Sequence, residues 1–244
     1  MTKIKIAFFV MLFLLCLMGA ANAVDDDWRP VFEKDDIAVY ARVHPDTDVR
    51  EYKAEAILDE DISSVSAVLD NIPAAVEWFP FCRFAGLIDE TDDGRKIIIN
   101  VADLPWPFQD RYAVFSSRKS GSAVSKQIVI NFQIDEDSLA RKVDPLVDTD
   151  GMVRVSFMKG QWTLTMLDRN KTEVVYTVCA DAGGSIPGWL ITTFFDSTPY
   201  KTLENLKQYV KKCNAQRSDM PGPEQSTVFP EGHPSSESSP FSGR

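Results

Sequence analysis

The chain has 244 residues, with 26 Lys and Arg against 36 Asp and Glu, and a formal net charge of −10. Nucleic acids are bound largely through Lys and Arg side chains that release counterions from phosphates, so this balance argues against a nucleic-acid partner. It argues equally against electrostatic docking on anionic lipid.

The first 23 residues are predicted to be a cleaved secretory signal. Lys3 and Lys5 give a positive start, residues 6–18 are apolar, and Ala21-Asn22-Ala23 resembles a cleavage site. The apolar run is short for a membrane span, which needs about 20 residues, although an uncleaved anchor is the alternative. We therefore expect export across the inner membrane, with the periplasm as the compartment.

Segments of strand length then follow in close succession. We predict strands at residues 37–43, 50–58, 83–89, 96–102, 111–118, 126–134, 152–167 and 172–182. A short entry segment, residues 28–32, precedes them. Strands do not alternate with helices, which excludes a parallel doubly wound sheet. The predicted class is α+β, with a curved antiparallel sheet of about eight strands.

Two short helical pieces interrupt the strands after residue 58. Asp61 is a candidate N-cap for a helix over residues 62–69, in which the apolar side chains share one face. Pro73 opens a second piece, which ends near Pro80.

A long amphipathic helix is predicted over residues 183–213. Gly183-Gly184 and the candidate N-cap Ser185 mark its start, and Pro199 should kink it or divide it in two. We expect this helix to cover the concave face of the sheet. Its later apolar face comprises Leu203, Leu206 and Val210.

The sequence thus predicts one domain over residues 24–213, followed by a tail. Residues 214–244 contain five Pro, seven Ser and three Gly with few apolar residues, so we expect them to be disordered. The mature chain holds three cysteines, which form either one disulfide and a free thiol or three buried thiols. They are Cys82, Cys179 and Cys213.

Four motifs in this order resemble those of the START (StAR-related lipid-transfer) family, within the helix-grip superfamily. They lie at residues 36–42, 77–80, 105–114 and 184–190. The resemblance covers residues 28–213. It implies a helix-grip fold with an internal apolar cavity between the sheet and the last helix, which holds one lipid or other apolar molecule.

The family also has a buried pair of an acid and an arginine in the cavity, and the matching positions here are Glu77 and Arg111. An isolated buried charge is very unfavourable, so such a site requires that the two charges pair. The alternative is that both are surface charges at element ends, which contribute little.

Aromatic residues near these motifs complete the candidate ligand site. Trp78 adjoins Glu77, and Trp106 lies between two prolines in a loop. Trp189 and Phe194 belong to the first half of the long helix. In a carrier, such rings line the cavity and its mouth, whereas in a plain globular domain they belong to the core.

Catalytic and metal sites find little support. The two histidines, His44 and His233, have no evident partner for nucleophilic catalysis. There is no CxxC motif or helical His pair, and residues 89–100 copy a calcium loop but end in Asn100, where a bidentate Glu is required. We expect no catalytic residue, metal or cofactor.

The favoured interpretation is an exported, monomeric carrier of one lipid or sterol-like ligand, in transient contact with membranes. One alternative is a helix-grip enzyme, of cyclase or hydrolase type, with Glu77 as a buried general acid or base. Another is a ligand-sensing module that reports to a protein partner through the acidic tail. The sequence leaves the identity of the ligand open.

Overall fold

The computed structural model describes residues 28–44, 47, 49–140, 146–181, 183 and 196–218. Within them, ten strands form one sheet in the order β1-β2-β3-β10-β9-β7-β6-β5-β4, with β8 beside β6. The strands are β1 (Arg29–Lys34), β2 (Ile37–Val43), β3 (Arg50–Leu58), β4 (Cys82–Glu90), β5 (Lys96–Ala102), β6 (Arg111–Ser122), β7 (Gln127–Gln133), β8 (Val153–Arg154), β9 (Phe157–Asp168) and β10 (Lys171–Asp181).

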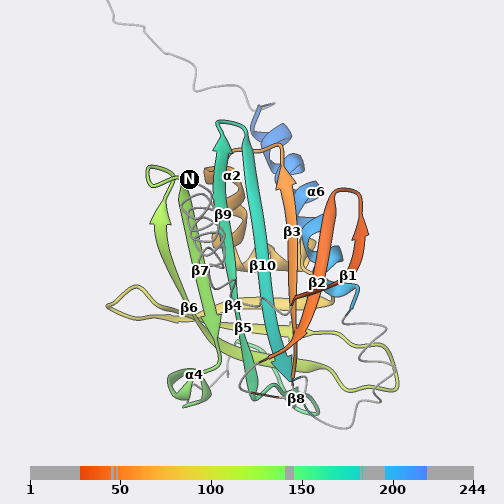
Figure 1. The fold of residues 1–244 in the computed structure, drawn as a ribbon. Coiled ribbons are helices and arrows are strands. Elements are labelled where there is room, and N and C mark those ends of the chain that lie inside the picture. The colour runs from red at the N-terminus through yellow and green to blue at the C-terminus, as the bar shows by residue number, and fades with distance from the viewer. Residues whose placement is uncertain are drawn as a thin grey trace, which may run out of the picture.

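The sheet is antiparallel except for β8, which pairs parallel with β6. It curves without closing, and the helices at residues 62–70 and 198–218, labelled α2 and α6, lie on the same side of it (Figure 1). The α+β class and the helix-grip architecture are confirmed. The sheet has more strands than the expected eight or so, because the entry segment forms β1 and residues 152–167 are divided into β8 and β9.

Both edge strands are irregular. The register of β1 against β2 shifts between Pro30 and Phe32. At the other edge, the register of β4 against β5 shifts between Cys82 and Phe84 and again between Leu87 and Asp89. Such β-bulges bend an edge strand and interrupt its row of hydrogen-bonding groups.

The short helices after β3 are α2 (Ile62–Asp70), the 3-10 helix η1 (Ile72–Ala74) and α3 (Ala75–Trp78). The predicted cap of α2 is confirmed, because the Asp61 carboxylate accepts hydrogen bonds from the backbone N–H of Ser63 and Ser64, both at 3.0 Å. A further short helix, α4 (Glu136–Ala140), was not predicted.

The C-terminal helix α6 (Thr198–Ser218) covers the second part of the predicted stretch and ends later than predicted. Residues 196–197 form a turn, so Pro199 lies in the first turn of α6, where its missing N–H leaves no bond unmade, and it does not kink the helix. The predicted stretch at residues 184–195 lies outside the described residues. At the other end, the side chain of Asn214 donates a hydrogen bond to Glu60, so residues 214–218 belong to the folded domain and not to the tail.

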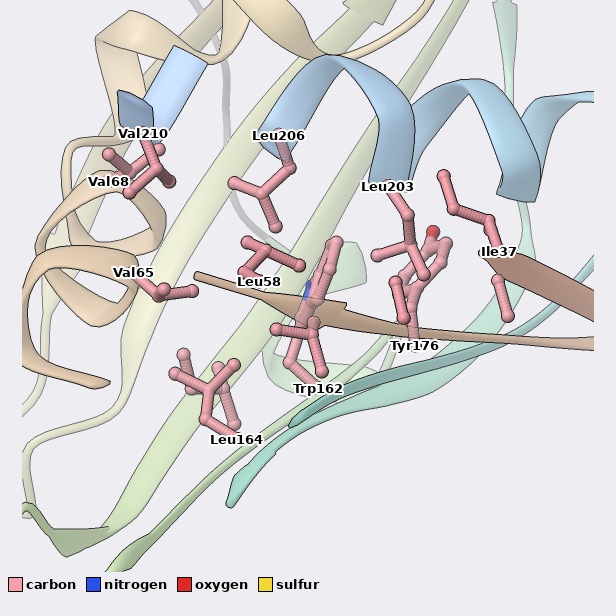
Figure 2. Packing of buried hydrophobic residues seen from close by; sticks show 14 of the residues in the cluster. Ile37, Leu58, Val65, Val68, Trp162, Leu164, Tyr176, Leu203, Leu206 and Val210 are labelled. Atoms are coloured by element: carbon pink, nitrogen blue, oxygen red, sulfur yellow. The ribbon is translucent and has the colours of Figure 1, made fainter. Parts of the chain in front are cut away.

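The main core lies between α6, α2 and the concave face of the sheet. Leu203, Leu206 and Val210 are fully buried, as the apolar pattern of α6 predicted. Figure 2 shows Leu203 and Leu206 pointing from the helix toward the side chains of Leu58, Trp162 and Tyr176 on the sheet.

Candidate ligand-binding site

Two adjoining pockets lie on the concave side of the sheet, with volumes of about 170 and 200 Å³. We call the first the aromatic pocket, whose rings are Trp78, Phe79, Phe115, Phe132, Trp162 and Tyr176. We call the second the arginine pocket, whose lining includes Arg50, Tyr52, Leu104, Arg111, Val155 and Val178.

The two pockets share part of their lining, which makes them neighbouring compartments of one region. The shared residues are Phe79, Asn100, Ala113, Met158 and Tyr176. Asn100 and Ala113 are cross-strand partners on β5 and β6.

The wall of the aromatic pocket is built by alternation along β9 and β10. Trp162 and Tyr176 are cross-strand partners, and their rings stack with centroids 4.2 Å apart. The ring of Phe132 stacks on Tyr176 and lies over Gly160, where the missing side chain makes room for it. Burial raises the pKa of Tyr176, which keeps its hydroxyl neutral.

Arg111 is the first residue of β6 and is only 6% exposed. Its guanidinium donates hydrogen bonds to the carbonyl oxygens of Gln109 and Gly183. Burial lowers the pKa of Arg111, while the neighbouring Asp110 carboxylate acts in the opposite direction. The arginine pocket therefore contains a buried, positively charged hydrogen-bond donor among mainly apolar side chains.

The start of α6 is tied to β3 beside the same pocket. The hydroxyl of Tyr52 donates to the carboxylate of Asp196, and the Nη1 atom of Arg50 lies 3.4 Å from Asp196 Oδ1. Burial is the main cause of the raised pKa of Tyr52, and the hydrogen bond to Asp196 raises this pKa further. Thr198 and Pro199, which begin α6, line the pocket as well.

The structure corrects the expected buried pair. Glu77 lies on α3 and is exposed, near Tyr209 of α6, whereas Arg111 is buried in the arginine pocket. Within α3, Val76 and Glu77 are exposed and Trp78 is buried, so the side chain that this short helix turns inward is the tryptophan and not the glutamate. Glu77 is thus neither the carboxylate of a buried pair nor a buried general acid.

The predicted aromatic residues have different outcomes. Trp78 is buried and lines the aromatic pocket. Trp106 is 92% exposed and lines neither pocket. Leu104, two residues earlier in the same loop, lines the arginine pocket. Trp189 and Phe194 lie outside the described residues. That any of them contacts a ligand stays a prediction.

The remaining sequence expectations concern cysteines, metals and membranes. Cys82, Cys179 and Cys213 are free thiols. In the described part of the chain, no cluster of three His, Cys, Asp or Glu could hold a metal ion. None of the helices seen there is both long and apolar enough to cross a membrane.

A family model described as the START domain matches residues 17–216. The chain belongs to the START domain family. Two curated proteins are similar to this chain. An uncharacterized protein of Pseudomonas aeruginosa is 24% identical over 79% of this chain and 91% of its own length. The second is the phosphatidylcholine transfer protein of Rattus norvegicus. The rat protein is 22% identical over 77% of this chain and 84% of its own length.

Solved structures agree with this assignment. A STAR-related lipid transfer protein from Xanthomonas axonopodis superposes with a TM-score of 0.64 at 28% identity, covering 76% of this START chain and 99% of its own. Human StAR-related lipid transfer protein 5 superposes with a TM-score of 0.67 at 18% identity, covering 87% and 98% of the two chains.

Sequence reasoning missed most of the pocket lining. Phe132, Met158 and Tyr176 come from strands far along the chain from residue 78, and only the sheet order brings them together. The residue pattern predicted strands at residues 126–134 and 172–182. It could not indicate which of their side chains border a space.

Proposed function

We propose that this START domain is a carrier that holds one apolar ligand, a lipid or a sterol-like molecule, in the aromatic and arginine pockets. The observation that carries the proposal is the pair of adjoining, largely apolar pockets on the concave side of the sheet, one under the segment from α2 to α3 and the other reaching the start of α6. The rat, Xanthomonas and human proteins described above support it, since each is named as a lipid transfer protein.

Partition of the ligand out of water would supply the binding energy. Removal of several hundred Å² of apolar surface at roughly 25 cal/mol per Å² is favourable by on the order of 10 kcal/mol before ordering costs. Together the two pockets reach the lower part of the about 300–1,000 Å³ range of small-molecule sites. A ligand of sterol size, or one with a single chain, suits this space.

Polar groups would orient the ligand. The charged side chains of the region, Arg50 and Arg111, both line the arginine pocket, together with Tyr52. The aromatic pocket is lined by rings and aliphatic groups apart from Asn100 and Ser117. The polar end of a ligand therefore belongs near Arg111, with its apolar body among the rings.

Export completes the proposal. The signal predicted in residues 1–23 would place the carrier in the periplasm, where an apolar molecule must cross an aqueous space between two membranes. Detection of the chain in the periplasmic fraction, shortened by the predicted signal, would support this part. Retention of the full-length chain in the cytoplasm would refute it.

The central experiment is native mass spectrometry of the purified full chain after incubation with a bacterial lipid extract. We expect one retained lipid per chain, unchanged in mass, because a carrier does not transform its ligand. Arg111→Met should lower retention by at least about tenfold, the effect of about 1.4 kcal/mol. Glu77→Gln, which alters an exposed charge that lines neither of these two pockets, is the matched control. No retained lipid would refute the carrier, and conversion of the lipid would indicate an enzyme.

A further inference from the structure

The outward face of α6 is basic, although the chain as a whole is acidic. Residues 198–218 contain five Lys and Arg and a single Glu, a charge of +4, so the rest of a chain with a net charge of −10 carries −14. Leu203 and Leu206 point from this helix toward the sheet, so its other side faces outward (Figure 2). A face whose charge opposes that of the whole protein can attract a partner of the other sign.

Three exposed lysines lie on the outward side of α6, and we call them the lysine stripe: Lys201, Lys211 and Lys212. Because an α-helix turns about 100° per residue, the three side chains fall within an arc of roughly 100° around its axis. Lys201 and Lys212 are about three turns apart, which is about 16 Å along the axis. The stripe therefore presents positive charge at both ends of a nearly straight line on the surface.

Among the residues that the structure describes, no carboxylate forms an ion pair with the stripe. Lysines on the sheet differ in this respect, since Lys53, Lys119 and Lys171 each form one. The single acid of α6, Glu204, accepts a hydrogen bond from the hydroxyl of Tyr200 at 2.8 Å. The charge of the stripe is therefore not balanced by a neighbouring acid in that part of the chain.

The other cations of α6 do have acidic neighbours. Lys207 attracts the carboxylate of Asp35, and Arg217 attracts that of Asp61. Arg217 also lies in the last turn of the helix, where the helix dipole favours a positive charge. Lys201 is the fourth residue of α6 and lies in its first turn, where the dipole disfavours such a charge. The stability of the helix alone therefore does not account for Lys201.

We propose that the lysine stripe is the docking surface for an acidic segment of a partner protein. An extended segment rises about 3.3 Å per residue, so about five residues with carboxylates at both ends span the stripe. Exposed charge pairs are individually weak, so the contact is reversible and is guided by charge. Docking is measured with a peptide and without lipid, so it stands or fails separately from the carrier proposal.

Two observations favour a protein segment over an anionic bilayer. A helix that lies on a bilayer buries its apolar face among the lipids, but the apolar face of α6 is packed in the core of this domain. No large apolar side chain in the described part of α6 is exposed. A flat anionic surface would also meet the charge of −14 on the rest of the chain, whereas a narrow segment meets only the stripe.

The test is fluorescence anisotropy of a labelled peptide of about ten glutamates, which at about 3.3 Å per residue is long enough to span the stripe, titrated with the full chain. We expect saturable binding that is lost in about 1 M salt, where the Debye length is only about 3 Å. The combined change Lys201→Gln, Lys211→Gln and Lys212→Gln should weaken binding by roughly tenfold or more, because three exposed charge pairs disappear. Glutamine is a good helix former, so the thermal midpoint should not change.

The matched control removes three exposed cations elsewhere: Arg29→Gln, Lys126→Gln and Arg169→Gln. These residues lie at the start of β1 and in two turns of the sheet, so the net charge changes equally while the stripe stays intact. Binding by this variant should match that of the wild type. An equal loss in both variants would show that net charge alone governs binding, which would overturn the proposal.

Three further outcomes would also overturn it. No binding of the peptide, or equal binding by the wild type and the stripe variant, would show that the stripe does not hold an acidic segment. Tighter binding after Glu224→Gln, Glu231→Gln and Glu237→Gln would show that residues 219–244 of the same chain cover the stripe. Flotation with phosphatidylglycerol vesicles that depends on the three lysines, without peptide binding, would indicate a bilayer as the partner.

Discussion

Gly160 offers a direct test of how the sheet and the aromatic pocket depend on each other. A Cβ atom at this position of β9 would lie closer than 3.0 Å to the backbone carbonyl oxygen of Thr177 and to the ring of Phe132, whose Cε2 atom would be 2.8 Å away. Real Cβ atoms essentially never approach that closely. Gly160→Ala must therefore shift either the central β9–β10 ladder or the ring that lines the pocket.

The size of the effect follows from overpacking. Inserting a methyl group into a packed core destabilises a protein by about 1–3 kcal/mol, which exceeds the gain of roughly 0.5–1 kcal/mol from replacing a strand glycine with alanine. For a domain of 150–250 residues, each kcal/mol lowers the midpoint by about 2–4 °C. We expect a fall in midpoint of several degrees. Lipid retention should also fall, because Phe132 is pushed toward the aromatic pocket.

Urea unfolding followed by tryptophan fluorescence measures the first effect, and native mass spectrometry measures the second. Gly86→Ala, on the edge strand β4, is the control: a Cβ there would meet the ring of Phe84 at 3.1 Å and the Cγ2 atom of Ile99 at 3.6 Å, and no backbone atom closer than these. Its free energy of unfolding should change by less than about 1 kcal/mol. If Gly160→Ala matches this control in both stability and lipid retention, the close packing of Phe132 over β9 is not what shapes the pocket.

Three further predictions concern the helix and the surface. Leu206→Ala should lower the free energy of unfolding by about 2–5 kcal/mol in urea titration, since Leu206 is fully buried; a smaller loss would show that α6 is loosely attached. A chain that ends at Ser218 should keep the thermal midpoint of the full chain. A chain that ends at Cys213 should have a lower midpoint, because it loses the last turn of α6 and the hydrogen bond from Asn214 to Glu60. Equal midpoints would contradict a stabilising role for that hydrogen bond. The hydrogen bond from the hydroxyl of Thr91 is the main cause that lowers the pKa of Asp93 to about 2. The stability that Asp93 contributes is therefore present above about pH 4 and lost as the pH falls toward 2. Asp93→Asn should make the thermal midpoint less dependent on pH over this window, and an unaltered pH profile would contradict the assignment.

The sequence was most informative where a strand has many buried apolar residues and is bounded by turn residues. The predicted strands at residues 37–43, 50–58 and 96–102 have the bounds of β2, β3 and β5. It was least informative where burial gives no alternation. β1 is exposed along most of its length, and β8 is a two-residue strand, so neither leaves a pattern that propensity can detect.

The candidate site shows the same limit. The burial of Arg111 fits the alternation of β6, which places Ala113 on the same side. The position of Glu77 could not be predicted, because α3 is too short for a periodic pattern to define its faces. Trp106 was assigned to a loop correctly, but residue type alone does not determine whether a loop aromatic turns inward or outward.

The irregular edges of the sheet have a consequence for how copies of this chain behave together. An open sheet has two rows of unpaired N–H and C=O groups, which can recruit a strand from another molecule. Here Pro30 contributes no N–H to one row, and the register shifts in β1 and β4 break the straight line that an incoming strand would need. The fold can therefore remain open enough to surround a ligand while offering neither edge as a template for aggregation.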